Sequence, residues 1–348
     1  MKLSDYTISL LEDIERRIDP ESEENYMSGW RRFWYGEYDG LVFSPCRDKV
    51  SSPGIEFKPI HINDALHDRE LMLDMQLQDL SARLGSKAAS LGIRANYGTG
   101  IMPSLFGAEI FEMPRETGNL PTTRSLNDSD KIREILECGL PDLNGGYGAD
   151  VFAFGEMCAE IFEKYPKIQK YVQVYHPDLQ GTLDVAELLW GGEMFYEMYD
   201  DPDFVHGILR LNTDTYRAFM KKWYTIIPKY GDITVHWGSV IRGPLLLRLD
   251  SGINLSPEFC REFSFPYDRE LLDYFGGGCM HFCGRGSHYI DDLCAIDSLY
   301  GINLSQPEMN DMDRIMNAVL KNDKRIFGLP NASLYVDRAG MKNSVVNA

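Results

Sequence analysis

The chain has 348 residues, of which 44% are hydrophobic and 25% are charged, and its formal net charge is −18. This is the composition of an ordinary globular protein with a sizeable core, and the acidic balance argues against nucleic acid and anionic membrane surfaces, which require basic patches. The chain opens without the apolar run of a signal peptide, and no later stretch approaches the roughly 18 apolar residues of a membrane span. Seven scattered cysteines do not resemble a secreted disulfide framework. We therefore expect a cytoplasmic protein.

The order of apolar and amphipathic segments predicts the fold class. The first 35 residues read as helical, with an aromatic face formed by Trp30, Phe33, Trp34 and Tyr35. Short apolar runs follow at 41–43, 90–96, 171–175, 244–249, 279–283, 299–304 and 325–329. Helical patterns lie between them at 63–84, 128–138, 150–164, 182–199, 202–224, 256–275, 286–297 and 309–321. Such alternation implies parallel strands joined by crossover helices.

Seven strands over this length favour a (β/α)8 TIM barrel, with an eighth strand that is atypical or incomplete. No repeat or flexible linker divides the chain. We expect an N-terminal helical extension over 1–40, packed on a barrel domain over 41–348, as one structural domain.

The fifth apolar run carries the most informative pair of residues. His281 and Cys283 stand two positions apart, so in a strand both side chains point to the same face. An imidazole and a thiol placed in this way could bind zinc as a bidentate pair of ligands, although zinc needs at least three protein ligands. The alternative is a buried strand in which both residues serve only packing.

Polar residues gather where the predicted strands end, which is where barrel enzymes place their chemistry. The candidates are Asn96 and Tyr97 after the second strand, Asp178 and Gln180 after the third, Arg248 and Asp250 at the fourth, Arg285 after the fifth, and Asn303 and Gln306 at the sixth. Turn and cap roles remain the alternative for any one of them. Arg94, Arg248 and Arg285 could clamp a carboxylate or phosphate, and His236 with Trp237 could form a stacking wall for a planar ligand or pack in a loop.

Four segments resemble the uroporphyrinogen decarboxylase superfamily. The stretch 250–267, Asp-Ser-Gly-Ile-Asn-Leu-Ser-Pro-Glu-Phe and onward to Pro-Tyr, is similar to its "DS...LSPexFxEFxxPY" signature, and 281–284 to its His-x-Cys-Gly strand. Segments 178–186 and 106–109 match in order and spacing, so the resemblance covers about residues 90–332. It implies a single barrel with tetrapyrrole or corrinoid chemistry at the carboxyl ends of the strands.

The two branches of this superfamily imply different sites. The decarboxylase branch has an arginine-rich loop after the first strand and an aspartate after the second. Here the first strand is followed by 44–49 with the single Arg47, and the second by Asn96 and Tyr97. The chain is therefore not expected to be an orthodox uroporphyrinogen decarboxylase.

The other branch contains the methylcobamide:coenzyme M methyltransferases. In it zinc is held by the His-x-Cys pair and a cysteine of the last strand, and it activates a thiol that accepts a methyl group from a methylcobamide. His281 and Cys283 match the first two ligands, but 333–348 contain no cysteine. Carboxylates such as Asp178, Asp250 or Glu308 are sterically plausible replacements, because zinc accepts oxygen ligands.

The resemblance leads to one expected function and two alternatives. We expect zinc-assisted methyl transfer from a methylated corrinoid to a thiol, with His281, Cys283 and Asp250 catalytic and His281 and Cys283 binding the metal. The residues expected to bind substrate are Asn96, Tyr97, Asp178, Gln180, Arg248, Arg285, Asn303 and Gln306. The alternatives are a decarboxylase of a porphyrinogen or smaller carboxylated substrate, and a non-catalytic corrinoid- or tetrapyrrole-binding barrel. Expected partners are a small-molecule substrate and a corrinoid-binding protein, with a homodimer left open.

Overall fold

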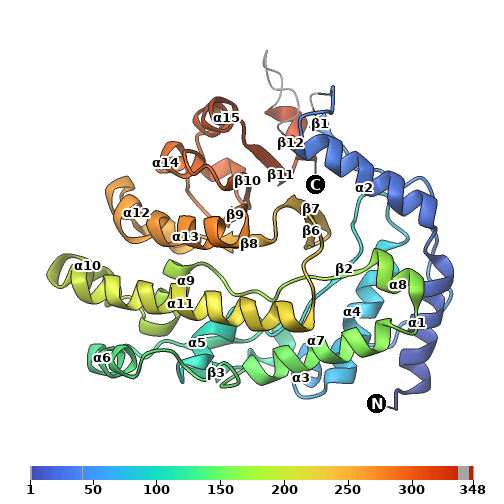
Figure 1. Cartoon of the computed structure of the whole chain (residues 1–348), viewed down its shortest axis with the longest axis horizontal. Coiled ribbons are helices and arrows are strands. Elements are labelled where there is room, and N and C mark those ends of the chain that lie inside the picture. Colours follow the sequence, from blue (N-terminus) through green and yellow to red (C-terminus); the bar gives the residue numbers. More distant parts are fainter. Residues whose placement is uncertain (1, 41, 336–344, 348) are drawn as a thin grey trace.

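The computed structural model describes residues 2–40, 42–335 and 345–347. It is a mixed α/β structure in which strands and helices alternate along most of the chain (Figure 1). The strands are β1 Val42–Phe43, β2 Gly92–Ile93, β3 Glu109–Phe111, β4 Thr122–Arg124, β5 Gln173–Val174, β6 Ile233–His236, β7 Ser239–Arg242, β8 Leu245–Arg248, β9 Gly278–Phe282, β10 Leu299–Leu304, β11 Arg325–Leu329 and β12 Val345–Asn347. Each of the seven predicted apolar runs contains one of these strands.

The helices follow the predicted segments with a few breaks. They are α1 Asp5–Arg17, α2 Pro20–Trp34, α3 Ile62–Ala65, α4 Arg69–Arg83, α5 Ile101–Leu105, α6 Ser129–Cys138, α7 Gly148–Phe162, α8 Pro166–Tyr171, α9 Thr182–Trp190, α10 Met194–Asp200, α11 Pro202–Ile226, α12 Pro257–Phe263, α13 Phe265–Phe275, α14 Ile290–Cys294 and α15 Met312–Lys321. The segment predicted as one helix over 182–199 divides because Gly191 adopts φ +98° and ends α9. None of the helices in the described residues is long and apolar enough to cross a bilayer.

Six parallel strands form the main sheet, in the order β1-β12-β11-β10-β9-β8. The short strand β12 lies between β11 and β1 and pairs in parallel with both. Strands β2 and β5 pair in parallel as a separate two-stranded sheet. His176, just after β5, links this sheet to β8, because its Nε2 accepts a hydrogen bond from the Leu246 amide at 3.1 Å. Across the described residues the two sheets remain separate in their strand pairing.

A β-hairpin that the sequence did not predict packs against the main sheet. Strands β6 and β7 are joined by the two-residue turn Trp237-Gly238, in which both residues have positive φ, 50° and 82°. This is the turn geometry that matches the twist of a hairpin, although a positive φ is uncommon for tryptophan. Strand β7 contacts β9, β10 and β11, so the turn lies close to the strands that carry the predicted site.

The N-terminal helices complete this packing. Helix α1 packs on α4 and α8, and α2 packs on α8 and β7; both run along the right-hand edge of Figure 1. Three residues of the predicted aromatic face, Trp30, Phe33 and Trp34, are buried in one cluster with the hairpin and with Phe43, whereas the fourth, Tyr35, is 43% exposed. Trp34 Nε1 also donates a hydrogen bond to the Val240 carbonyl of β7 at 2.9 Å. The remaining core lies between the strands and the surrounding helices.

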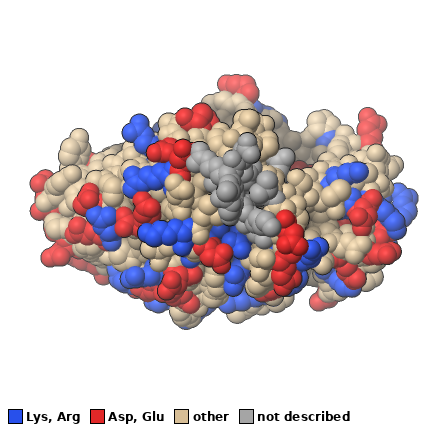
Figure 2. All heavy atoms as spheres, turned by 90° about the horizontal axis from the view of Figure 1, so that it is seen from above, with Lys and Arg blue, Asp and Glu red and all other residues tan. Residues whose placement is uncertain are grey.

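The surface charge is mixed. On the face shown in Figure 2, Lys and Arg side chains are interleaved with Asp and Glu. All seven cysteines are free thiols.

Candidate metal centre

The carboxyl ends of β8 and β9 bring three metal-ligating side chains together. Asp250 follows β8, His281 lies in β9, and Cys283 follows β9. One ligand atom from each lies within 4.8 Å of the others. His281 Nε2 is 3.3 Å from Cys283 Sγ and 3.7 Å from Asp250 Oδ1. Ligand atoms around a tetrahedral zinc with bonds of 2.0–2.3 Å stand about 3.3–3.6 Å apart, and the two distances from His281 Nε2 are close to that spacing.

Asn303 orients the imidazole. Its amide nitrogen donates to the Phe327 carbonyl at 2.7 Å, which turns its oxygen toward His281 Nδ1 at 2.6 Å. With Nδ1 acting as the donor, the lone pair of Nε2 faces Cys283 and Asp250. Such a partner behind a ligating histidine fixes its tautomer and ring orientation. The predicted substrate residue Asn303 therefore lies behind a candidate metal ligand.

A buried carboxylate that the sequence reasoning did not select supports Asp250. Asp184, in the first turn of α9, accepts hydrogen bonds from the amides of Asp250 at 3.0 Å and Ser251 at 2.8 Å. Burial, with the neighbouring Asp250 carboxylate, raises the pKa of Asp184 to about 7. Asp250 Oδ1 in turn accepts from the Cys283 amide at 2.6 Å, which ties the loop after β8 to the loop after β9. The sequence signal that could have identified Asp184 is its position in the first turn of a helix within the matched segment 178–186.

Electrostatics set the protonation of the two β9 ligands. Burial lowers the pKa of the His281 imidazole, against the opposing effect of the Asp250 carboxylate. Burial also raises the pKa of the Cys283 thiol, and the same carboxylate acts in that direction while the Ser305 hydroxyl opposes it. The imidazole is thus a neutral donor, and a bound cation would be needed to hold Cys283 as a thiolate.

A second network links the predicted pocket residues of β5 and β8. Asp178 lies 3.3 Å from Arg94 and 3.3 Å from Arg248, and Gln180 donates to it at 2.7 Å. Burial alone would raise the pKa of Asp178, but the guanidinium groups of Arg248 and Arg94 more than offset it, so its pKa lies below the usual value. Two of the three arginines that were expected to clamp a ligand, Arg94 and Arg248, are therefore engaged with a protein carboxylate.

The turn residue Trp237 joins this network to the metal centre. The guanidinium carbon of Arg248 lies 3.9 Å from the centre of the Trp237 ring, and that ring meets His281 edge to face at 5.1 Å. The indole of Trp237 therefore contacts both a cation and a candidate ligand.

Asp250, one of the three residues, lines a cavity of about 570 Å³, here called the mouth cavity. Its polar lining includes Gln180, Asp184, Glu187, Asp250 and Asn254. A volume of this size is typical of small-molecule sites, and three of these side chains are carboxylates.

The other predicted site residues do not belong to the triad, and only some of them lie close to it. Gln306 accepts a hydrogen bond from the Gly284 amide at 2.6 Å and so holds the loop after Cys283. Arg285 is exposed on that loop. Tyr97 is buried in the core against Tyr147, with ring centres 5.0 Å apart, and the neighbouring Asn96 is half-buried.

The predicted third ligand Glu308 and two further residues able to bind a metal, His288 and Cys279, do not join the triad. Glu308 is exposed, and His288 contacts the Leu255 carbonyl at 2.9 Å. Cys279 lies in the buried cluster beneath the hairpin, and its thiol points to the Arg242 carbonyl.

Comparison with known proteins adds no relative. No protein-family model matches this chain and no curated protein matches it, so its likeness to the uroporphyrinogen decarboxylase superfamily rests on the motifs quoted above.

Proposed function

We propose that this chain is a (β/α)8-barrel enzyme that binds zinc through Asp250, His281 and Cys283 and transfers a methyl group from a methylated corrinoid to a thiol. Eight short parallel strands, β1, β2, β5 and β8 to β12, support the barrel. Strand β12 pairs with β1, and His176 after β5 is hydrogen-bonded to β8. The sequence motifs support the reaction class.

The observation that carries the proposal is the position of Asp250. The resemblance supplied two zinc ligands and left the third without a cysteine. Asp250 Oδ1 lies 3.7 Å from His281 Nε2, although the two residues are 31 positions apart in the chain. Three protein ligands of N, S and O type, with the fourth position left for water or substrate, are the arrangement of a catalytic zinc site.

The residues of the chain have separable roles in this mechanism. Asn303 keeps His281 Nε2 free to bind the metal, and Asp184 holds Asp250 through two backbone amides. Gln306 fixes the loop that follows Cys283. A bound zinc ion supplies the Lewis acidity that keeps an acceptor thiol deprotonated near neutral pH. The mouth cavity beside Asp250 gives the reacting molecules access to the centre.

One contact weighs against porphyrinogen decarboxylation. Arg47, the single arginine of the loop after β1, is 1% exposed and binds Glu23 and the carbonyls of Ser86 and Ala89. It therefore has no donor directed to the carboxylates of a substrate.

Metal analysis of the purified protein tests the proposal first. We expect about one equivalent of zinc in the wild type and its loss in His281→Ala and Asp250→Ala. His67→Ala is the matched control, since His67 is exposed and pairs with Glu112 away from the triad. Less than a few tenths of an equivalent in the wild type, unchanged in His281→Ala, contradicts the proposed mechanism.

Demethylation of methylcobalamin with a panel of thiols, followed optically, tests the reaction itself. We expect turnover in the wild type and in His67→Ala, and none in Cys283→Ser. Zinc binding with methylcobalamin binding but no turnover with any thiol would favour the non-catalytic corrinoid-binding barrel.

A further inference from the structure

One side of helix α9 lines the mouth cavity. Asp184, Glu187, Leu188 and Gly191 belong to the lining and follow one another at intervals of three, one and three residues, which places them on the same side of a helix. Most of the remaining lining comes from the loop after β2, the segment between β4 and α6, and the loop after β8. The cavity therefore lies between α9 and loops that follow the strands.

The charge of the lining is negative. The described residues that line the cavity include three carboxylates and no Lys, Arg or His. Asp184 is committed to the amides of Asp250 and Ser251, and Asp250 belongs to the proposed metal triad. Glu187 has no part in that centre and is half-buried. A carboxylate at such a position attracts a cation more strongly than one in bulk water.

Two side-chain amides add hydrogen-bond acceptors to the lining. Gln180 Nε2 donates to Asp178 at 2.7 Å, and Asn127 Nδ2 donates to the Ser125 carbonyl at 3.0 Å. Since their nitrogens are directed to protein acceptors, their oxygens are left to accept from a ligand. Both residues have positive φ, 64° and 47°, and Gln180 is only 5% exposed. A positive φ is uncommon outside glycine, and such backbone is frequent at ligand sites.

The arginines around the metal centre do not line this cavity. Arg94 and Arg248 pair with Asp178. Arg285 is exposed on the loop after Cys283 and is not part of the lining. An anionic group would therefore meet like charge in the cavity, which is disfavoured, whereas a cationic donor would meet carboxylate and amide oxygens.

We propose that the methyl acceptor is a short aminothiol, whose ammonium group binds Glu187 and the side-chain oxygen of Gln180 while its thiol lies at the metal triad. The inference rests on the proposed function. Glu187 lies about 4.5 Å of helix rise beyond Asp184, which binds the Asp250 amide, so a short chain between thiol and amine suffices. The thiol proton passes to solvent, the S–C bond forms as the Co–C bond of the methylated corrinoid breaks, and the electron pair of that bond stays on cobalt.

Three thiols with the same two-carbon chain test the charge of the acceptor. Cysteamine carries an ammonium group, 2-mercaptoethanol a hydroxyl and 2-mercaptoethanesulfonate a sulfonate. Demethylation of methylcobalamin by the zinc-loaded full-length protein should show kcat/KM, compared per thiolate, about tenfold higher for cysteamine than for 2-mercaptoethanol, and lowest for the sulfonate.

Variants assign this preference to the cavity. Glu187→Gln should lower kcat/KM for cysteamine about tenfold and affect 2-mercaptoethanol less; this comparison of one thiol between proteins cancels differences in thiol acidity. Glu137→Gln is the matched control, because Glu137 is exposed on α6 outside the lining. Asn254→Lys places a cation at an exposed lining position and should favour the sulfonate over cysteamine, which keeps the test decisive if Glu187→Gln does not fold.

Binding of the S-methyl products separates this inference from the proposed function, since it requires neither a methyl donor nor turnover. In calorimetric titrations 2-(methylthio)ethylamine should bind at one site, about tenfold or more tightly than 2-(methylthio)ethanesulfonate, and more weakly to Glu187→Gln. This order of binding without turnover of any thiol supports the cation site and contradicts methyl transfer. Equal or reversed order of amine and sulfonate, or no saturable binding of the amine, overturns the inference.

Discussion

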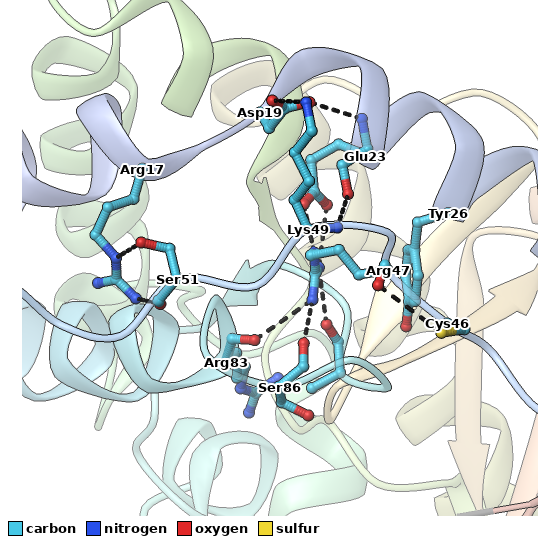
Figure 3. A network of polar contacts seen from close by, with 12 residues as sticks. Arg17, Asp19, Glu23, Tyr26, Cys46, Arg47, Lys49, Ser51, Arg83 and Ser86 are labelled. Atoms are coloured by element: carbon cyan, nitrogen blue, oxygen red, sulfur yellow. Dashed lines mark hydrogen bonds and ion pairs between the residues drawn. The ribbon is translucent and has the colours of Figure 1, made fainter.

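The buried pair Arg47–Glu23 connects three segments that are distant in sequence, and its removal gives a sharp test of how these segments pack. Glu23 comes from α2, Arg47 from the loop after β1, and the carbonyls of Ser86 and Ala89 from the loop before β2 (Figure 3). The side chains of the pair are 4% and 1% exposed. The guanidinium also lies 4.8 Å from the centre of the Tyr26 ring. Neither charge can be hydrated if its partner is removed.

The expected cost follows from this burial. Glu23→Gln removes the carboxylate and leaves a buried guanidinium without a counter-charge, which costs about 3–5 kcal/mol. Arg47→Met leaves the Glu23 charge unpaired and in addition strands the Ser86 and Ala89 carbonyls, each worth about 1–3 kcal/mol. We therefore expect Arg47→Met to be the more destabilising change. The double variant Glu23→Leu/Arg47→Met removes both charges and should recover at least about 2 kcal/mol relative to the sum of the single changes.

Urea unfolding followed by far-ultraviolet circular dichroism and tryptophan fluorescence measures these differences. Lys49→Met is the matched control, because Lys49 pairs with Asp19 near the same loop but is exposed, and its unfolding midpoint should stay close to the wild-type value. A Glu23→Gln variant within about 1 kcal/mol of the wild type, or additive effects in the double variant, would refute the reasoning.

Three further changes test other parts of the structure. Asn303→Ala frees the ring of His281 and should weaken zinc binding about 10- to 100-fold in a competition titration with a chelator, whereas unaltered affinity would show that the ring is held by packing alone. Burial lowers the pKa of His176 to about 4, so its stabilising contribution is complete above pH 6.5 and is lost as the pH falls from 6.5 to 4. Over this range the free energy of unfolding of the wild type should fall by about 3 kcal/mol more than that of His176→Gln. Urea unfolding at each pH measures this difference, and parallel pH profiles would contradict the assignment. A Cβ at Gly181 would lie 1.9 Å from the Arg248 carbonyl oxygen at the end of β8, while one at Gly192 would meet no atom within 4 Å. Gly181→Ala should therefore lower the free energy of unfolding by about 3 kcal/mol, and Gly192→Ala should not. Equal unfolding midpoints of the two variants would exclude the close approach at Gly181.

The hydrophobic pattern of the sequence was sufficient to predict most of the alternating strands and helices. Apolar runs such as 299–304 and amphipathic stretches such as 202–224 correspond to β10 and α11, because the period of the hydrophobic pattern depends only on neighbours in the chain. The β6–β7 hairpin was missed, since its turn is Trp237-Gly238 and carries none of the Asn-Gly or Asp-Gly chemistry that marks such turns. Strand β12 has three residues, too few to show a period.

By itself the sequence determined the composition class, the alternation of strands and helices, and the closeness of His281 and Cys283 at the end of a strand. Only the tertiary structure selected Asp250 from several candidate carboxylates and revealed Asp184 behind it, because the relevant distances depend on how β8, β9 and α9 meet. It likewise assigned Arg47 and Arg248 to protein partners. The physical reason is that the residue type fixes the chemistry of a side chain, whereas its partners depend on contacts between segments that are distant in the sequence and close only in the folded structure.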